Sequence, residues 1–252
     1  MSLRNVIIHY HFFKNAGTSL DHSLKKAFPG GWLQLEADAE GPVTADRILS
    51  RFREQPELVV LSSHTARLVL PRPDDMQIFP LVFIRHPLDR VLSVYQFERR
   101  QTEDTEGSLQ ARKLELPAFV EWRLARPHDH SFRNFQVHRL AGLADDGGNP
   151  ADPYRQGLEG LQKLPFVGLV EAFDQSIYCL QAWLRPWFAG IELKTVKLNV
   201  TQAEQTTLVE RLAYLKASLG PALYLRLLQE NEADMQLYRQ VAAMYDRHQI
   251  PA

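Results

Sequence analysis

Cysteine is almost absent from this chain, and neither sign of charge is in excess. The 252 residues include a single cysteine, Cys179, which cannot form a disulfide within the chain. This usage favours a reducing compartment, so we expect a cytoplasmic protein. Lysine and arginine number 29 against 30 aspartates and glutamates, a formal net charge of −1. We therefore expect no nucleic-acid partner, because such binding usually leaves a basic footprint.

Long apolar runs are missing as well. No stretch approaches the roughly 18 uncharged apolar residues needed to cross a bilayer, so we predict no transmembrane segment. The run from Val6 to Phe13 contains two histidines and ends at Lys14, which indicates a buried strand and not a signal peptide. Apolar residues make up 45% of the chain and charged residues 23%, which excludes disordered and fibrous classes. At this length we expect one domain spanning residues 1–252.

Apolar runs and amphipathic segments alternate along the chain. Near-continuous Val, Ile, Leu and Phe predict parallel strands covered on both faces at residues 6–13, 58–62, 81–84 and 166–170. Helices are predicted at 19–28, 45–54, from Pro87 onward, and at 116–124, 132–140 and 174–183. Thr201 and Glu204 predict a capping box before a helix that ends at Gly220-Pro221, and a last helix continues to about His248. The alternation predicts an α/β fold with a central, mainly parallel sheet flanked by helices and a helical C-terminal part.

The clearest chemical signal is the segment His11-Phe12-Phe13-Lys14-Asn15-Ala16-Gly17-Thr18-Ser19-Leu20. A buried strand ends there, a lysine and a small-residue turn follow, and a helix opens. The unpaired N–H groups at a helix N-terminus form an anion site, and Gly17 lets a phosphate or sulfate approach the backbone. The segment is not an ATP-type phosphate loop, because that loop ends in Gly-Lys-Ser/Thr and Lys14 stands at the start of this one. The alternative is an ordinary strand-to-helix turn with Thr18 or Ser19 as N-cap.

Two further polar positions follow predicted strands. Arg85 ends the strand at 81–84, and Ser93 lies eight residues later on the next helix, so both could converge on one phosphate. The alternative for Arg85 is a surface pair with Asp89. His64 falls just beyond the strand at 58–62 and is either a structural histidine or a base. Because open α/β sheets bind ligands at the carboxyl ends of their strands, we expect Lys14, His64 and Arg85 to share one edge.

These segments resemble a known enzyme family. Residues 11–19 resemble the 5′-phosphosulfate-binding motif of sulfotransferases that use 3′-phosphoadenosine 5′-phosphosulfate (PAPS), and residues 83–95 resemble their 3′-phosphate-binding motif. The likeness is strongest to the carbohydrate branch, which contains heparan sulfate 2-O-sulfotransferases and bacterial relatives. Weaker similarity continues at 134–142, 167–174 and 198–201.

The resemblance implies a P-loop-like three-layer fold and in-line transfer of a sulfuryl group from PAPS to an acceptor hydroxyl, with 3′-phosphoadenosine 5′-phosphate (PAP) as product. Lys14 would contact the bridging oxygen and stabilise the leaving phosphate, and His64 would be the catalytic base. Arg85 and Ser93 would hold the 3′-phosphate. The 5′-phosphosulfate would be cradled by Asn15, Ala16, Gly17, Thr18 and Ser19.

Other readings remain open at this point. His9 with His11, and His128 with His130, could suggest a metal, but neither pair has a cysteine or carboxylate partner at a diagnostic spacing, so we predict no metal site. A nucleotide-dependent phosphotransferase or kinase of related topology lacks its Gly-Lys-Ser/Thr and a clear magnesium-binding aspartate. A non-catalytic module that binds PAPS or a sulfated glycan would show binding without transfer.

The acceptor is less defined than the donor. Residues 98–139 hold eight lysines and arginines against seven carboxylates, too small an excess to predict a polyanion. Trp122, Phe132 and Phe135 could stack on a sugar or form part of the core. We expect a hydroxyl-bearing glycan or small molecule as the acceptor.

Overall fold

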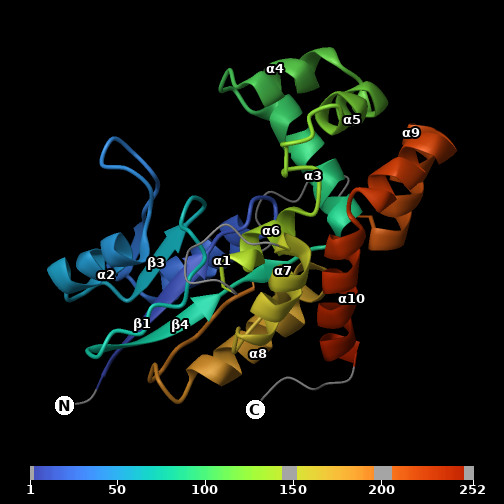
Figure 1. Ribbon diagram of the computed structural model, residues 1–252. Helices are drawn as coiled ribbons and strands as arrows, with labels where there is room; N and C mark the ends of the chain where they lie inside the picture. The colour runs from blue at the N-terminus through green and yellow to red at the C-terminus, as the bar shows by residue number, and fades with distance from the viewer. Residues whose placement is uncertain (1–2, 144–151, 196–205, 247–252) are drawn as a thin grey trace.

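The computed structural model describes residues 3–143, 152–195 and 206–246 (Figure 1). Its elements in chain order are β1 (Arg4–Tyr10), α1 (Gly17–Ala27), β2 (Trp32–Gln34), α2 (Ala45–Glu54), β3 (Val60–Ser63), β4 (Met76–Leu81), β5 (Phe83–Ile84), α3 (Pro87–Arg100), α4 (Glu106–Lys113), α5 (Leu116–Leu124), α6 (Phe135–Ala141), α7 (Pro153–Gln162), β6 (Gly168–Leu169), a 3-10 turn (Val170–Ala172), α8 (Phe173–Leu184), α9 (Leu208–Gln229) and α10 (Glu232–Asp246).

Parallel strands form the centre of the molecule. Four of them pair in the order β2-β3-β1-β4, and Ile8 of β1 lies opposite Leu61 of β3 and Pro80 of β4. A second parallel pair, β5 with β6, follows β4 after the single residue Val82. The backbone N–H of Gly168, in β6, donates to the carbonyl of Val82 at 2.9 Å, so the residue between β4 and β5 is also hydrogen-bonded to a strand. The predicted parallel sheet is confirmed.

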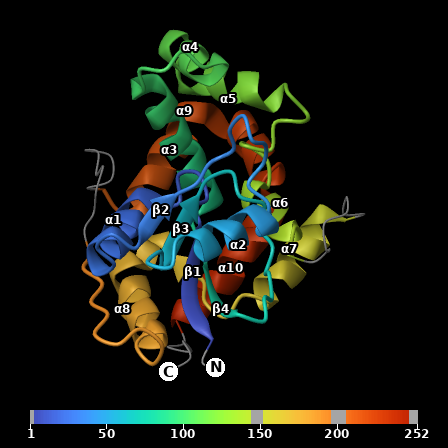
Figure 2. The same cartoon turned by 90° about the vertical axis from the view of Figure 1, so that its left-hand side faces the viewer.

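Helices cover both faces of this sheet. Side chains alternate along a strand, so Val6 and Ile8 of β1 face one core while Ile7 faces another. The first core is closed by α2, α6, α7 and α10, and the second by α1 and α8. Figure 2 shows these two helical layers on opposite sides of the strands. This is the three-layer α/β arrangement expected from the sequence.

A third apolar cluster lies among helices alone. It joins α3, α5 and α9 with a contribution from α4, and these helices extend beyond the sheet at the top of Figure 1. Its centre includes Leu88, Phe119, Phe132 and Leu215, each fully buried. The C-terminal part of the chain is therefore helical, as predicted. Among the described residues, no helix is long and apolar enough to span a membrane.

Several predicted boundaries are wrong. The first strand ends at Tyr10 and not at Phe13, because the chain turns there toward α1, which begins at Gly17 and not at Ser19. The strand predicted at 81–84 is divided at Val82, and β2 was not predicted. The capping box observed before α9 joins Thr207 and Glu210; the box predicted at Thr201 and Glu204 lies outside the described residues.

The C-terminal helices divide at two places. Gly220 has non-helical angles (φ 71°, ψ 167°), and Pro221 follows it, as the sequence predicts. A second break separates α9 from α10, so the single last helix expected after Pro221 is wrong. The Asn231 side chain explains this break: it is buried and donates to the carbonyls of Phe132 (2.9 Å) and Leu227 (3.0 Å), which ties the interruption to the core.

Candidate functional site

Three strand ends place the predicted polar residues at one edge of the sheet. Lys14 lies in the turn after β1, His64 follows β3, and Arg85 follows β5. β1 and β3 pair in parallel, so their carboxyl ends point the same way. β5 begins one residue after β4, which is also parallel to β1.

The lysine turn has an unusual backbone. Lys14 (φ 64°) and Ala16 (φ 58°) both adopt the left-handed conformation, which costs a non-glycine residue about 1–2 kcal/mol. The Asn15 side chain between them is buried and donates to the Phe83 carbonyl at 2.7 Å and to Oε1 of Gln136 at 2.8 Å. Asn15 therefore fixes the turn against β5, and its Nδ2 group makes both of its hydrogen bonds within the protein.

The N-terminus of α1 has no side-chain cap. The helix begins at Gly17, and its N-cap residue, Ala16, has no side-chain oxygen to accept a hydrogen bond from the first turn. Neither Thr18 nor Ser19 is the N-cap, so the ordinary capped turn considered above is wrong. Thr18 is exposed and Ser19 is buried. A Cβ at Gly17 would lie 2.1 Å from Cδ2 of His11, so the imidazole requires glycine here.

Arg85 connects the lysine turn to the start of α3. Its side chain is buried; Nη1 donates to the Lys14 carbonyl at 3.0 Å, and Nε donates to Asp89 at 2.8 Å. The pair with Asp89 exists, but Arg85 is not at the surface. Arg211 of α9 donates to the same carboxylate at 2.6 Å. Burial alone would raise the pKa of Asp89, but the two guanidinium groups hold that pKa below its usual range.

The charges in this cluster favour an anion. Arg85 and Arg211 carry two positive charges against the single negative charge of Asp89. Ser93 lies four residues after Asp89 in α3 and is buried, so both project from the same face of the helix. Arg211 was not predicted, because 122 positions separate it from Asp89.

His64 is held by a carboxylate. Its Nδ1 lies 2.8 Å from Oε1 of Glu36, and Glu36 also accepts the backbone N–H groups of His64 and Thr65 at 3.1 Å. Burial would raise the pKa of Glu36, but these hydrogen bonds, led by those from His64, lower it to about 2. The contact with Glu36 fixes the orientation of the imidazole, and Nε2 lies on the opposite side of the ring from this contact. The side chain is 39% exposed.

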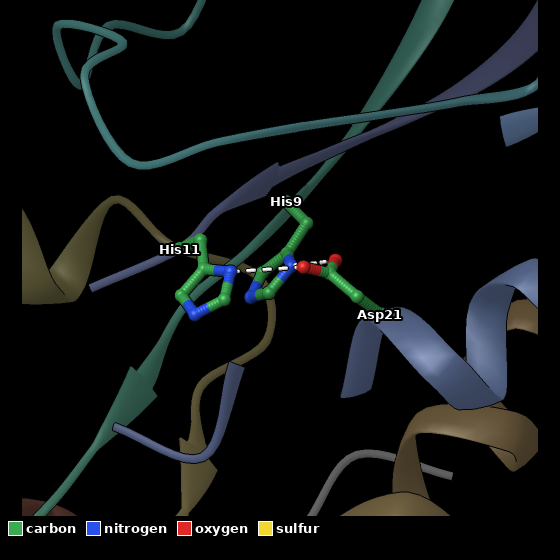
Figure 3. Close-up of side chains that lie close together, drawn as sticks. All are labelled: His9, His11 and Asp21. Atoms are coloured by element: carbon green, nitrogen blue, oxygen red, sulfur yellow. Dashed lines mark hydrogen bonds and ion pairs between the residues drawn. The ribbon is translucent and has the colours of Figure 1, made fainter. Parts of the chain in front are cut away.

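His11 links His64 to the N-terminus of α1. The two imidazole rings lie 3.7 Å apart with an interplanar angle of 31°. Asp21 of α1 accepts from Nδ1 of His11 at 2.8 Å and from Nδ1 of His9 at 2.7 Å (Figure 3). No diagnostic spacing in the sequence marks this carboxylate as a partner of the histidines, but α1 folds back on β1 and brings Asp21 to both of them.

Gln136 of α6 supports both halves of the site. Its Oε1 accepts the Arg85 amide at 2.9 Å, and its Nε2 donates to the Arg85 carbonyl at 2.9 Å. Gln136 is fully buried, and its backbone N–H donates to the buried carboxylate of Asp234 at 3.0 Å. Because the same Oε1 also accepts from Asn15, one side chain sets the relative positions of the lysine turn and Arg85.

The three aromatic candidates for sugar stacking pack within the protein. Phe132 is fully buried in the helical cluster, and Trp122 stacks on Phe119 with ring centroids 5.4 Å apart. Phe135 lies under the guanidinium of Arg90 at 4.1 Å. These contacts favour the core reading over sugar binding.

Two surface hollows lie elsewhere on the molecule. One of about 360 Å³ is lined along α8 by residues such as Asp174 and Gln181, and one of about 300 Å³ lies near Met76 at the other end of β4. Neither lining includes Lys14, His64 or Arg85. The strand-end edge remains the candidate site, because Arg85 contacts the lysine turn there and His11 connects His64 to the start of α1.

Comparison with known proteins identifies one relative. No family model matches the chain. The chain is similar to an uncharacterized protein of Archaeoglobus fulgidus, with 34% identity over 249 residues that cover 96% of this chain and 98% of that protein. A match of this extent includes the sheet, the candidate site and the helical C-terminal part alike. The chain therefore belongs to the same family as this archaeal protein.

Proposed function

We propose that the protein is a sulfotransferase that moves the sulfuryl group of PAPS to an acceptor hydroxyl. The observation that carries the proposal is the hydrogen bond of 3.0 Å from Nη1 of Arg85 to the Lys14 carbonyl. It joins two anion-binding features, the lysine turn with the N-terminus of α1 and the Arg85–Arg211 pair. A nucleotide with phosphates at both the 3′ and the 5′ positions of one ribose needs two such features side by side.

The residues fit the parts of this donor. Backbone N–H groups at the start of α1 suit the 5′-phosphosulfate, because the N-cap residue Ala16 has no side chain that accepts hydrogen bonds from them. Arg85 and Arg211 supply planar charged forks for the 3′-phosphate, with Ser93 on the adjacent helix face. Asp89 keeps both guanidinium groups oriented. This pairing favours a nucleotide with a 3′-phosphate over ATP.

The transfer itself would be an in-line displacement at sulfur. The acceptor oxygen forms a bond to sulfur while the bond from sulfur to the bridging oxygen of the 5′-phosphate breaks, and PAP leaves. Nε2 of His64 takes the hydroxyl proton, and Glu36 stabilises the resulting imidazolium. Lys14 neutralises the charge that develops on the leaving phosphate. Positioning and electrostatics dominate the rate, as in loose phosphoryl transfer.

The acceptor and the compartment form part of the same proposal. Because His64 is 39% exposed, the acceptor hydroxyl can belong to a glycan or to a small molecule. A single cysteine, Cys179, fits a reducing compartment, so we place the reaction in the cytoplasm.

Labelled-sulfate transfer tests the proposal. The protein is incubated with PAPS carrying labelled sulfate and a panel of glycans, phenols and small alcohols. We expect label in at least one acceptor class, and about 100-fold slower transfer after Lys14→Ala or His64→Ala. Lys26→Ala and His22→Ala, which change neighbouring residues of α1, serve as matched controls and should leave the rate unchanged.

Two results would contradict the proposal. If PAP binds but no acceptor is labelled, the protein is a binding module and not a transferase. If Lys14→Ala and His64→Ala transfer sulfate as fast as the two controls, the roles assigned to those side chains are wrong.

A further inference from the structure

His9, His11 and Asp21 form a compact cluster beneath the candidate site. Their ligand atoms, one from each side chain, all lie within 4.8 Å of one another. Figure 3 shows the imidazoles of His9, in β1, and of His11, just after β1, beside the Asp21 carboxylate on α1. His9 and His11 are 1% and 5% exposed, and Asp21 has a side-chain exposure of 15%. The cluster thus joins β1 to α1 in a nearly closed environment.

The Asp21 carboxylate is paired with two histidines, His9 and His11, and, among the described residues, forms no ion pair with a lysine or an arginine. Burial would raise the pKa of Asp21, but the two histidines outweigh burial and hold that pKa well below its usual range. Burial lowers the pKa of His11. Among the described residues, the two imidazoles are thus the groups that face the Asp21 carboxylate as ion-pair partners.

An additional oxygen lies beside His9. Its Nδ1 is 2.7 Å from Oδ1 of Asp21 and 3.1 Å from Oγ of Ser62. A single N–H cannot point at two oxygens with good geometry, so hydrogen bonding alone leaves this arrangement imperfect. A bound cation would remove this conflict, because the imidazole nitrogens and the carboxylate oxygen would each direct a lone pair at one central ion.

We propose that His9, His11 and Asp21 bind a divalent transition-metal ion of the Zn²⁺ class. Two imidazole nitrogens and one carboxylate oxygen form a common donor set for zinc, with a further position left for water. The ion cross-links β1 to α1 and fixes the His11 ring against Gly17 and His64. The site does not depend on the transfer reaction, because its ligands are separate from the residues assigned to PAPS.

Cobalt provides a direct spectroscopic test. Protein without a histidine tag is treated with a chelator, dialysed, and titrated with Co²⁺ while the visible absorption is recorded. We expect bands of nitrogen- and oxygen-coordinated cobalt that saturate at one ion per chain and disappear when Zn²⁺ is added. Zn²⁺ alone should raise the melting temperature.

Variants assign the ligands. Asp21→Asn, which keeps the side-chain shape, and His9→Ala should each weaken metal binding by about 100-fold or more. His22→Ala removes the histidine next to Asp21 in sequence, which has no place in the cluster, and should bind like the wild type. Circular dichroism shows whether each variant is folded.

The proposal is wrong if the wild-type protein gives no saturable cobalt bands, whatever the variants do. It is also wrong if folded Asp21→Asn binds as tightly as the wild type, because the ion then lies elsewhere. PAP binding is measured separately on metal-free protein, so a failed metal titration leaves the proposed sulfotransferase activity untouched, and loss of PAP binding leaves the metal site untouched.

Discussion

Replacing Gly17 with alanine tests how the anion-binding turn and the histidines are packed together. The new Cβ would lie 2.1 Å from Cδ2, 2.2 Å from Nε2 and 2.5 Å from Cγ of His11, whereas ordinary contacts begin at 3.4 Å. The ring must therefore move by more than 1 Å. It cannot do so and also keep both its 2.8 Å hydrogen bond to Asp21 and its contact with the His64 ring, whose centroid lies 3.7 Å from its own.

The expected cost follows from these contacts. Overpacking a closely packed site costs about 1–3 kcal/mol, and loss of a hydrogen bond to a charged group costs about 1.5–3 kcal/mol. Since the ring will keep part of one contact, we expect Gly17→Ala to lower the free energy of unfolding by about 3 kcal/mol. In a chain of this size that corresponds to a fall in melting temperature of about 6–12 °C.

A double-mutant cycle with His11→Ala isolates the cause. Once the imidazole is gone, Gly17→Ala should cost almost nothing, because alanine favours helix over glycine by up to about 1 kcal/mol. Urea unfolding followed by circular dichroism measures all four proteins, and the coupling energy should be about 3 kcal/mol. Gly30→Ala is the control: its φ is +75° with no atom within 4 Å of the new Cβ, so its cost should be the same in both backgrounds. An equal loss from Gly17→Ala with and without His11 would refute the reasoning.

Two further substitutions probe carboxylates that the sequence did not single out. Glu36→Gln removes the charge that faces Nδ1 of His64 and should slow sulfate transfer by about 10-fold, measured as kcat, whereas exposed Glu57→Gln should not; equal rates would remove Glu36 from the mechanism. Burial raises the pKa of Glu171 to about 7, above its unfolded value of about 4.3, so the folded protein holds an extra proton between these values and loses stability as pH rises through them. Glu171→Gln keeps the protonated shape, so in urea unfolding it should match the wild type at pH 4 and exceed it at pH 8 by at most about 4 kcal/mol; a difference independent of pH would contradict this.

Much of the fold could be predicted because its buried strands are nearly continuous apolar runs. The helices at Ala45–Glu54 and Leu116–Leu124 have the predicted ends, since a threonine cap and a Pro-containing first turn mark their starts. β2 has only three residues, which is too short for the alternation of apolar and polar residues that marks a strand. The division of the third run at Val82 also has no local signal, because the strand changes partner there while its composition stays apolar.

The sequence predicted some residues of the candidate site but not the residues that contact them. Lys14, His64 and Arg85 could be placed because residues that end parallel strands share one edge. Their partners could not be placed, since the contacts join distant positions: 28 residues separate Glu36 from His64, and 51 separate Gln136 from Arg85. The pairing of β2 with β3 brings Glu36 to His64, and the packing of α6 brings Gln136 to Arg85.

Calorimetric titration with PAP and with ADP tests the central claim most directly. Both ligands carry two phosphates on one adenosine, and they differ in whether one phosphate is at the 3′ position. We predict that PAP binds about 100-fold more tightly than ADP, as two charged hydrogen-bonding forks would provide, and that Arg85→Gln or Arg211→Gln brings the two affinities within about 10-fold of each other. Arg100→Gln, an exposed change in α3, should keep the full difference. Equal affinities for PAP and ADP in the wild-type protein would contradict the assignment of this edge to a 3′-phosphorylated nucleotide.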